Sequence, residues 1–245
     1  MLNSYNCDSF IKDLEEFHIQ ISEKQIDQFI LYYELLVEWN SFMNLTAITE
    51  FDDVIKKHFV DSVSLVKAIP DLNVKEYTLI DIGTGAGFPG IPLKIIFPGL
   101  KVVLLDSLNK RISFLDEVIN RLELSDIEAF HGRAEEYAKM KGYREAFDLC
   151  VSRAVSNLST LSEYCIPFVK KNGYFISYKS EKIKEEYEDA EKAINILGGK
   201  YENQIDFYLP NSDIYRNLFV IKKIKDTPSK YPRKAGLPSK EPIKY

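Results

Sequence analysis

Residues 81–90 read Asp-Ile-Gly-Thr-Gly-Ala-Gly-Phe-Pro-Gly, and this stretch decides the fold class. It follows a short apolar run at residues 77–82 and precedes an apolar, helix-like stretch at residues 91–97. Glycine lets the chain turn tightly and brings the backbone close to a ligand. A strand, a glycine loop and a helix in this order predict the first unit of a doubly wound α/β sheet.

The glycine spacing formally matches a dinucleotide fingerprint, because Gly85, Gly87 and Gly90 are arranged as Gly-x-Gly-x-x-Gly. The glycine series, however, starts at Gly83 and is preceded by Asp81 at the end of the strand. A carboxylate there repels a pyrophosphate and attracts a positively charged group. S-adenosylmethionine carries an ammonium group and a sulfonium and has no phosphate, so the loop favours this ligand over NAD.

The rest of the chain continues the alternation of strand and helix. Further short runs rich in apolar or aromatic residues lie at residues 101–106, 127–130, 147–152, 174–178, 200–208 and 218–224. Helical patterns separate most of them, and a long charged helix is expected at about residues 181–197. Pro210-Asn211-Ser212 separates the last two runs, which suits an antiparallel end. We therefore predict an α/β fold with a Rossmann-like, doubly wound, mostly parallel seven-stranded sheet.

The first seventy residues read as helical, with no strand signal before residue 77. Ser22 and Gln25 form a capping-box pattern, and apolar residues then recur at helical spacing to about Asn40. Residues 40–46 are expected to form a loop, and Asp52 or Asp53 to cap a third helix. We divide the chain into a helical extension (1–70), a ligand-binding domain (71–225) and a tail (226–245).

Composition excludes several classes of protein. The chain has 245 residues, of which 45% are hydrophobic and 28% charged, as in ordinary globular domains. Its apolar runs are far shorter than the roughly 20 residues of a bilayer span, and no secretory signal is visible. Three cysteines and three histidines, widely spaced, argue against disulfides and a zinc site. We expect a cytoplasmic protein without a metal.

The charge of the chain is uneven. Residues 222–245 carry eight basic and two acidic side chains, whereas the whole chain has a net charge of −5. Four prolines argue against regular structure in this tail. We expect an extended basic tail that meets a polyanion, with a solvated tail that touches nothing as the alternative.

Asp106 ends the second predicted strand, where a carboxylate is well placed to bind the hydroxyls of a ribose. NAD enzymes share this feature, so Asp106 does not discriminate between ligands. The alternative is that Asp106 caps the helix that follows.

At these residues the sequence resembles the class I S-adenosylmethionine-dependent methyltransferases. More narrowly, it resembles the small-subunit ribosomal RNA guanine-N7 methyltransferases, also called the glucose-inhibited division protein B family. The matching segments are residues 44–48, 58–62, 81–90, 106–115, 132–135, 152–154 and 232–238. Together they span residues 40 to 240, and their order is more specific than the glycine loop alone. One departure is Ser180, where a glycine is expected after Lys179.

The resemblance implies an enzyme that uses S-adenosylmethionine to methylate N7 of a guanine in the 16S rRNA of the 30S ribosomal subunit. We separately expect a monomer. Guanine N7 has a free lone pair and no proton, so no catalytic base is expected, and Arg153 lies near the reaction centre. The implied cofactor residues are Gly83, Gly85, Phe88, Asp106, Ala134, Glu135 and Arg153. The expected RNA-binding residues are His58, Arg233 and Lys234.

Several of these residues also fit structural roles. Glu135 fits a solvated glutamate in the first turn of a helix, and Arg153 fits a surface ion pair. Phe88 fits either plain packing or stacking on the target base, and His58 either a solvated helix face or the wall of an RNA cleft. Three other functions stay open: a small-molecule methyltransferase, a non-catalytic ribosome-assembly factor that binds RNA, and an NAD-dependent oxidoreductase.

Overall fold

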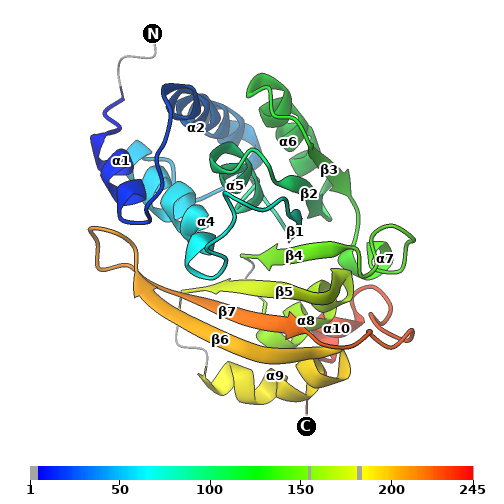
Figure 1. Ribbon diagram of the computed structural model, residues 1–245. Coiled ribbons are helices and arrows are strands. Elements are labelled where there is room, and N and C mark those ends of the chain that lie inside the picture. The colour runs from blue at the N-terminus through cyan, green and yellow to red at the C-terminus, as the bar shows by residue number, and fades with distance from the viewer. Residues whose placement is uncertain (1–4, 154–155, 181–183, 245) are drawn as a thin grey trace.

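The computed structural model describes residues 5–153, 156–180 and 184–244 (Figure 1). Its described part contains a seven-stranded sheet in the order β3-β2-β1-β4-β5-β7-β6. The strands are β1 (Thr78–Ile82), β2 (Lys101–Asp106), β3 (Ile127–His131), β4 (Phe147–Ser152), β5 (Val169–Lys179), β6 (Gly199–Tyr208) and β7 (Tyr215–Lys223). The first five run parallel, and β7 pairs antiparallel with both β5 and β6. The predicted α/β class and mostly parallel seven-stranded sheet are confirmed.

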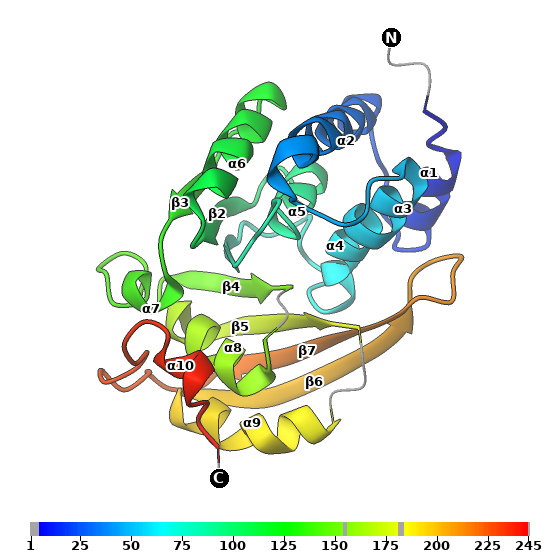
Figure 2. The same ribbon diagram turned by 180° about the vertical axis from the view of Figure 1, so that it is seen from behind.

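Helices cover both faces of this sheet (Figures 1 and 2). On one face lie α2 (Glu23–Met43), α5 (Gly90–Ile96) and α6 (Asn109–Arg121), and on the other α8 (Leu158–Cys165) and α9 (Lys184–Ile196). Neighbouring strand residues alternate between the two cores, as Leu79 and Ile80 do. Because both faces are covered, the strands are apolar at nearly every central position.

The N-terminal helices share one core with the sheet. The aromatic rings of Phe10, Phe29 and Phe59, from α1 (Asp8–Glu15), α2 and the helical segment after it, pack on one another, and the core continues to Leu79. The segment after α2 runs through α3 (Phe51–Val54), the π-helix η2 (Ile55–Val60), α4 (Asp61–Val63) and the 3-10 helix η3 (Ser64–Lys67). The division of the chain at residue 70 stays a prediction.

Two helix boundaries differ from the sequence expectations. The Ser22–Gln25 capping box is present, but α2 continues to Met43 and ends at Asn44, whose φ is 51°. The segment at 40–46 is therefore only partly a loop. The predicted cap of the third helix is wrong, because Glu50 occupies the cap position and makes no side-chain capping bond. Asp52 and Asp53 lie inside the first turn instead.

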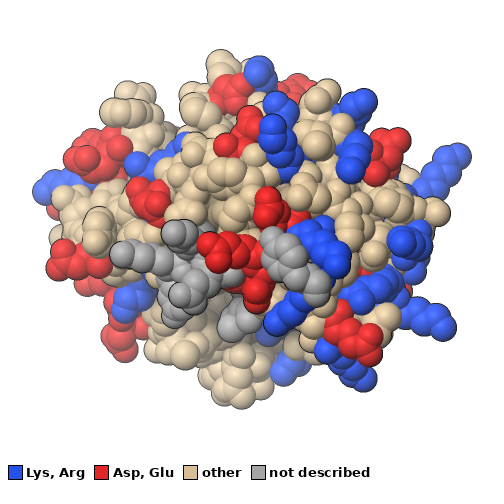
Figure 3. All heavy atoms as spheres, turned by 90° about the horizontal axis from the view of Figure 1, so that it is seen from below, with Lys and Arg blue, Asp and Glu red and all other residues tan. Residues whose placement is uncertain are grey.

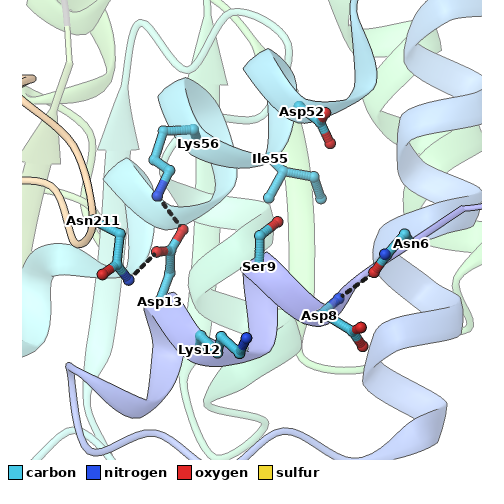
Figure 4. A pocket seen from close by; sticks show the side chains of 9 residues that line it. All are labelled: Asn6, Asp8, Ser9, Lys12, Asp13, Asp52, Ile55, Lys56 and Asn211. Carbon is cyan, nitrogen blue, oxygen red and sulfur yellow. Dashed lines mark hydrogen bonds and ion pairs between the residues drawn. The ribbon is translucent and has the colours of Figure 1, made fainter.

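A buried carboxylate joins the N-terminal helices to the loop between β6 and β7 (Figure 4). Asp13 of α1 is 1% exposed and pairs with Lys56 of η2. Asn211 donates from Nδ2 to Asp13 Oδ1 at 3.1 Å, and Lys56 Nζ donates to the carbonyl of Pro210 at 2.6 Å. Asp13, Lys56 and Asn211 line a hollow of about 660 Å³ at this junction.

The tail packs against the molecule, so the expectation of an extended tail is wrong. Arg144 donates to the carbonyl oxygens of Thr227 and Tyr231 at 2.7 and 2.9 Å. Arg233 pairs with Glu163 of α8 at 2.6 Å, and this carboxylate is only 1% exposed. The short helix α10 (Leu237–Lys240) follows. A distant carboxylate thus binds Arg233, a cation that the sequence suggested was free for a polyanion.

No helix within the described ranges is long and apolar enough to cross a membrane.

Candidate functional site

The candidate site lies where the parallel strands end. The glycine loop follows β1, Asp106 ends β2, and Arg153 follows β4. Ligands of open α/β sheets bind at this edge, near the point where the strand order reverses. In this sheet the reversal falls between β1 and β4.

The glycines of the loop have two different roles. At Gly87 and Gly90 an added Cβ would lie 2.5 Å from Ile91 Cδ1 and 2.3 Å from Leu104 Cδ2, so packing requires glycine there. At Gly85, with φ of 64°, the same atom would meet only a carbonyl oxygen at 4.0 Å. Gly83 is exposed and also has a positive φ, of 70°. The first half of the loop therefore presents open backbone to a ligand.

Asp81 supplies a buried carboxylate oxygen beside this backbone. Its side chain is fully buried, and its Oδ2 accepts hydrogen bonds from Thr84 Oγ1 at 2.7 Å and from the Gly90 amide at 2.9 Å. Within the described ranges Oδ1 has no hydrogen-bond partner. Burial raises the pKa of Asp81 to about 7. A buried, half-satisfied carboxylate next to open backbone fits a ligand that brings its own cation or hydrogen-bond donor.

Asp106 is also buried, and both of its oxygens are engaged. Oδ2 accepts from the Gly85 amide at 2.9 Å and from Arg111 Nη1 at 3.0 Å, while Oδ1 accepts from the Leu108 amide at 2.9 Å. The capping alternative is wrong, because Leu108 is the cap of α6 and makes no side-chain capping bond. Since a carboxylate oxygen accepts about two hydrogen bonds, Oδ1 retains capacity for a hydroxyl.

Ala134 and Glu135 open α7 (Ala134–Tyr137), directly after β3. The side chain of Glu135 is 5% exposed, and its Oε1 accepts from the Gly236 amide of the tail at 2.7 Å. The alternative of a solvated glutamate is therefore wrong. Glu135 joins this side of the candidate site to the tail.

Arg153 lies at the centre of a cluster of side chains from four parts of the chain. Its Nη1 donates to Asp61 Oδ2 at 3.0 Å and to the Lys57 carbonyl at 3.2 Å. Its guanidinium carbon lies 5.0 Å from the centre of the Phe88 ring. Asp61 is buried and accepts a second arginine, Arg216 of β7, at 2.9 Å. Arg153 is thus held by a buried carboxylate, which excludes the surface ion pair considered for it.

His58 lies in the same cluster as a neutral ring. It stacks on Phe88 with ring centres 4.6 Å apart, and its Nε2 lies 3.0 Å from Thr46 Oγ1. Burial and the charge of Arg153 lower the pKa of His58 to about 3. An ionic contact between His58 and phosphate is therefore excluded at neutral pH, whereas its role as a wall of an RNA cleft stays a prediction. Packing accounts for Phe88, and its stacking on a base also stays a prediction.

The sequence analysis missed Arg216, because β7 reaches the cluster only through its antiparallel pairing with β5. Tyr178 of β5 belongs to the same wall and donates from its hydroxyl to the Ser62 carbonyl at 2.7 Å. The spacing of His58 and Asp61 was the available signal, since both side chains meet Arg153.

The remaining candidates lie apart from this cluster. Lys179 donates to the Ser156 carbonyl and to Glu186, at 3.0 and 2.7 Å. Lys234 is exposed on the tail. The described ranges contain no group of three or more His, Cys, Asp or Glu side chains that could hold a metal ion.

Solved structures share the arrangement of the sheet and define the fold class. An S-adenosylmethionine-dependent methyltransferase from Aquifex aeolicus superposes with a TM-score of 0.50 at 18% identity, covering 70% of this chain and 93% of the other. TYW2 from Pyrococcus horikoshii, in complex with MeSAdo, also gives a TM-score of 0.50, at 13% identity, covering 68% and 61%. The fold is that of the class I methyltransferases.

Sequence comparison then gives the family. The family model described as rRNA small subunit methyltransferase G matches residues 25–213. A relative of that name from Lachnoclostridium phytofermentans is 57% identical over 235 residues, covering 96% of each chain. Another, from Lactococcus lactis subsp. cremoris, is 53% identical and covers 97% of this chain and 99% of its own. The chain belongs to the rRNA small subunit methyltransferase G family, and the resemblance predicted from its motifs is confirmed.

Proposed function

We propose that this protein transfers a methyl group from S-adenosylmethionine to N7 of a guanine in 16S rRNA. The observation that carries the proposal is the unpartnered, buried Oδ1 of Asp81 beside the open backbone of the glycine loop. Membership of the methyltransferase G family supports an RNA of the small ribosomal subunit as the substrate. This protein's choice of N7 rests on the motif resemblance.

The amino-acid end of S-adenosylmethionine carries an ammonium and a carboxylate. The site offers a carboxylate for the first and a guanidinium for the second. Asp81 would accept from the ammonium and Arg153 would face the carboxylate. The backbone of Gly83 and Gly85 leaves room for this end of the cofactor. Asp106 would accept a ribose hydroxyl through Oδ1.

The adenine would lie against Ala134 and Glu135 at the start of α7. Glu135 is fixed by the tail through the Gly236 amide, so the tail helps to shape this side of the site. We therefore expect the tail to support cofactor binding as well as RNA binding.

The bound cofactor supplies an electrophilic methyl group on its sulfonium. The chain has to hold guanine N7 in line with that methyl group and exclude water, because N7 carries no proton that a base must remove. Phe88 and the neutral His58 form an aromatic wall beside Arg153 that suits this role. The guanine ring gains positive charge during transfer, so an acceptor oxygen close to the bound base would stabilise it.

Methyl transfer from labelled cofactor to unmethylated 30S particles tests the proposal, with the modified base mapped afterwards. We expect one methyl group per particle at N7 of a guanine, and strong loss of transfer in Asp81→Asn. Cofactor binding without transfer to RNA would favour a small-molecule methyltransferase. RNA binding without cofactor binding would favour an assembly factor. Either result would refute the proposal.

A further inference from the structure

A basic surface lies along the edge of the sheet opposite the candidate site. We call it the basic edge and define it by exposed lysines from four segments: Lys139, Lys141, Lys171, Lys200, Lys225 and Lys230. Among the described residues none of these lysines forms an ion pair with a carboxylate. No function considered so far uses them.

The four segments are neighbours in space. They are the loop before β4, the start of β5, the start of β6 and the chain after β7. The Glu145 amide donates to the Pro167 carbonyl at 2.9 Å, and the Ile224 amide donates to the Gly198 carbonyl at 2.8 Å. Arg144 joins the first segment to Thr227 of the last. In Figure 3, Lys and Arg gather on the side of the molecule where the tail lies in Figure 1.

Ordinary surfaces mix the two signs of charge. In this region most carboxylates are already paired with other lysines. Residues 137–148, 169–173, 199–202 and 222–231 hold ten basic and four acidic side chains, in a chain of net charge −5. Three of the four carboxylates pair with lysines outside the basic edge. These pairs are Glu145 with Lys223, Asp148 with Lys170, and Glu202 with Lys222. The six lysines are therefore left to make a positive potential facing solvent.

The basic edge is separate from the site of methyl transfer. A six-residue strand such as β4 is about 20 Å long, so Lys171, Lys200 and Lys225 lie about that far from the strand ends that carry the glycine loop. Lys139 is nearer to the adenine side of the site, because it follows Glu135 by four residues. We infer that the basic edge is a second binding surface for the phosphate backbone of the substrate RNA, away from the methylated base. The identity of the RNA rests on the proposed function. The substrate is then a folded RNA that reaches both edges.

A charge-reversal pair tests this surface in the full-length protein. The test variant is Lys171→Glu/Lys225→Glu, and the matched control is Lys12→Glu/Lys24→Glu, which reverses two exposed lysines on the N-terminal helices. Binding to 30S particles and to protein-free 16S rRNA is measured as a function of salt, beside cofactor binding and thermal unfolding. These binding measurements do not depend on methyl transfer, so failure of the proposed reaction would be seen separately.

We expect the test variant to bind both RNAs about tenfold more weakly than the control, because two phosphate contacts are lost. Each lost contact should also lower the slope of affinity against salt by roughly 0.7–0.9. Cofactor binding should be unchanged. Equal RNA binding by the test and control variants would overturn the proposal. A loss seen with 30S particles but not with protein-free rRNA would also overturn it, because the partner would then be a ribosomal protein.

Discussion

Asp61 and Asp81 are two carboxylates of the candidate site, and both are almost completely buried. Both oxygens of Asp61 have a donor within the fold, because Arg153 donates to Oδ2 and Arg216 donates to Oδ1. Asp81 has two donors on Oδ2 and none on Oδ1 in the described ranges. Burial raises the pKa of Asp81 to about 7. The fold supplies donors to both oxygens of Asp61, whereas one oxygen of Asp81 is left for a ligand. We therefore expect substitution of Asp61 to reduce stability and substitution of Asp81 to reduce cofactor binding.

The largest expected effect is on stability and belongs to Asp61. Asp61→Ala leaves two arginines, each 17% exposed, without their carboxylate. We expect the free energy of unfolding to fall by about 3 kcal/mol, the lower end for breaking a buried pair, because water still reaches both guanidinium groups. Urea unfolding measures this effect. A loss below about 1 kcal/mol would show that the cluster is not a structural support.

Asp81→Asn should show the opposite pattern, with binding lost and the fold retained. The amide oxygen of Asn can accept from Thr84 and Gly90 as Oδ2 does, while its NH2 group replaces the unpartnered Oδ1. We expect cofactor affinity at pH 7 to fall by about 1.5–3 kcal/mol, the range for a hydrogen bond to a charged group. Calorimetric titration measures it, with Asp116→Asn, an exposed carboxylate on α6, as the control.

The acid dependence of stability separates Asp81 from His58. The raised pKa of Asp81 adds stability at low pH that is lost as pH rises towards 7. The lowered pKa of His58, about 3, adds stability above pH 6.5 that is lost as pH falls. Between pH 7 and 5 the two groups should oppose each other by about 2 kcal/mol each.

Single variants should expose each contribution. We compare the change in the free energy of unfolding when the pH falls from 7 to 5. This change should be more favourable in His58→Asn than in the wild type, and less favourable in Asp81→Asn. Unfolding in urea at the two pH values measures the change. If the two variants differ from the wild type in the same direction, the assignment of His58 as neutral and of Asp81 as a group that ionises near pH 7 is contradicted.

The smallest expected effect concerns the tail. Removing residues 228–245 takes away the Gly236 amide that holds Glu135, so we expect a severalfold loss of cofactor affinity. The deletion also leaves Glu163 buried without Arg233, so circular dichroism must first show a folded protein. The point variant Arg233→Met keeps the hydrogen bond from the Gly236 amide to Glu135. If it is folded, it should bind the cofactor normally. Equal cofactor binding by the folded deletion and the wild type would contradict a role of the tail at the adenine side.

Local signals explain which parts of the fold could be predicted from the sequence. The runs at 101–106 and 147–152 coincide with β2 and β4, because strands buried on both faces are apolar throughout. The path of the tail could not be predicted, since Arg233 depends on Glu163, seventy positions away. The π-helix η2 could not be predicted either, because its Lys57 and His58 carbonyls accept from Arg153, which is distant in the sequence.

The candidate site divides in the same way. Gly83, Asp81 and Asp106 could be placed from the sequence, because the loop and the strand end bring them together locally. Arg216 could not, because it enters from β7, the last strand along the chain. No local signal in the sequence indicates that Arg233 pairs with the buried Glu163, and its RNA-binding role stays a prediction.

The pH dependence of cofactor affinity tests the central claim, that Asp81 is the carboxylate left open for the ligand. The measurement is the dissociation constant of S-adenosylmethionine between pH 5.5 and 7, where the ligand's ammonium stays protonated. With a pKa of about 7 for Asp81, affinity of the wild type should rise by about tenfold or more across this range, and that of Asp81→Asn should stay flat. A flat wild-type profile, or a variant that binds as tightly as the wild type at pH 7, would contradict the account.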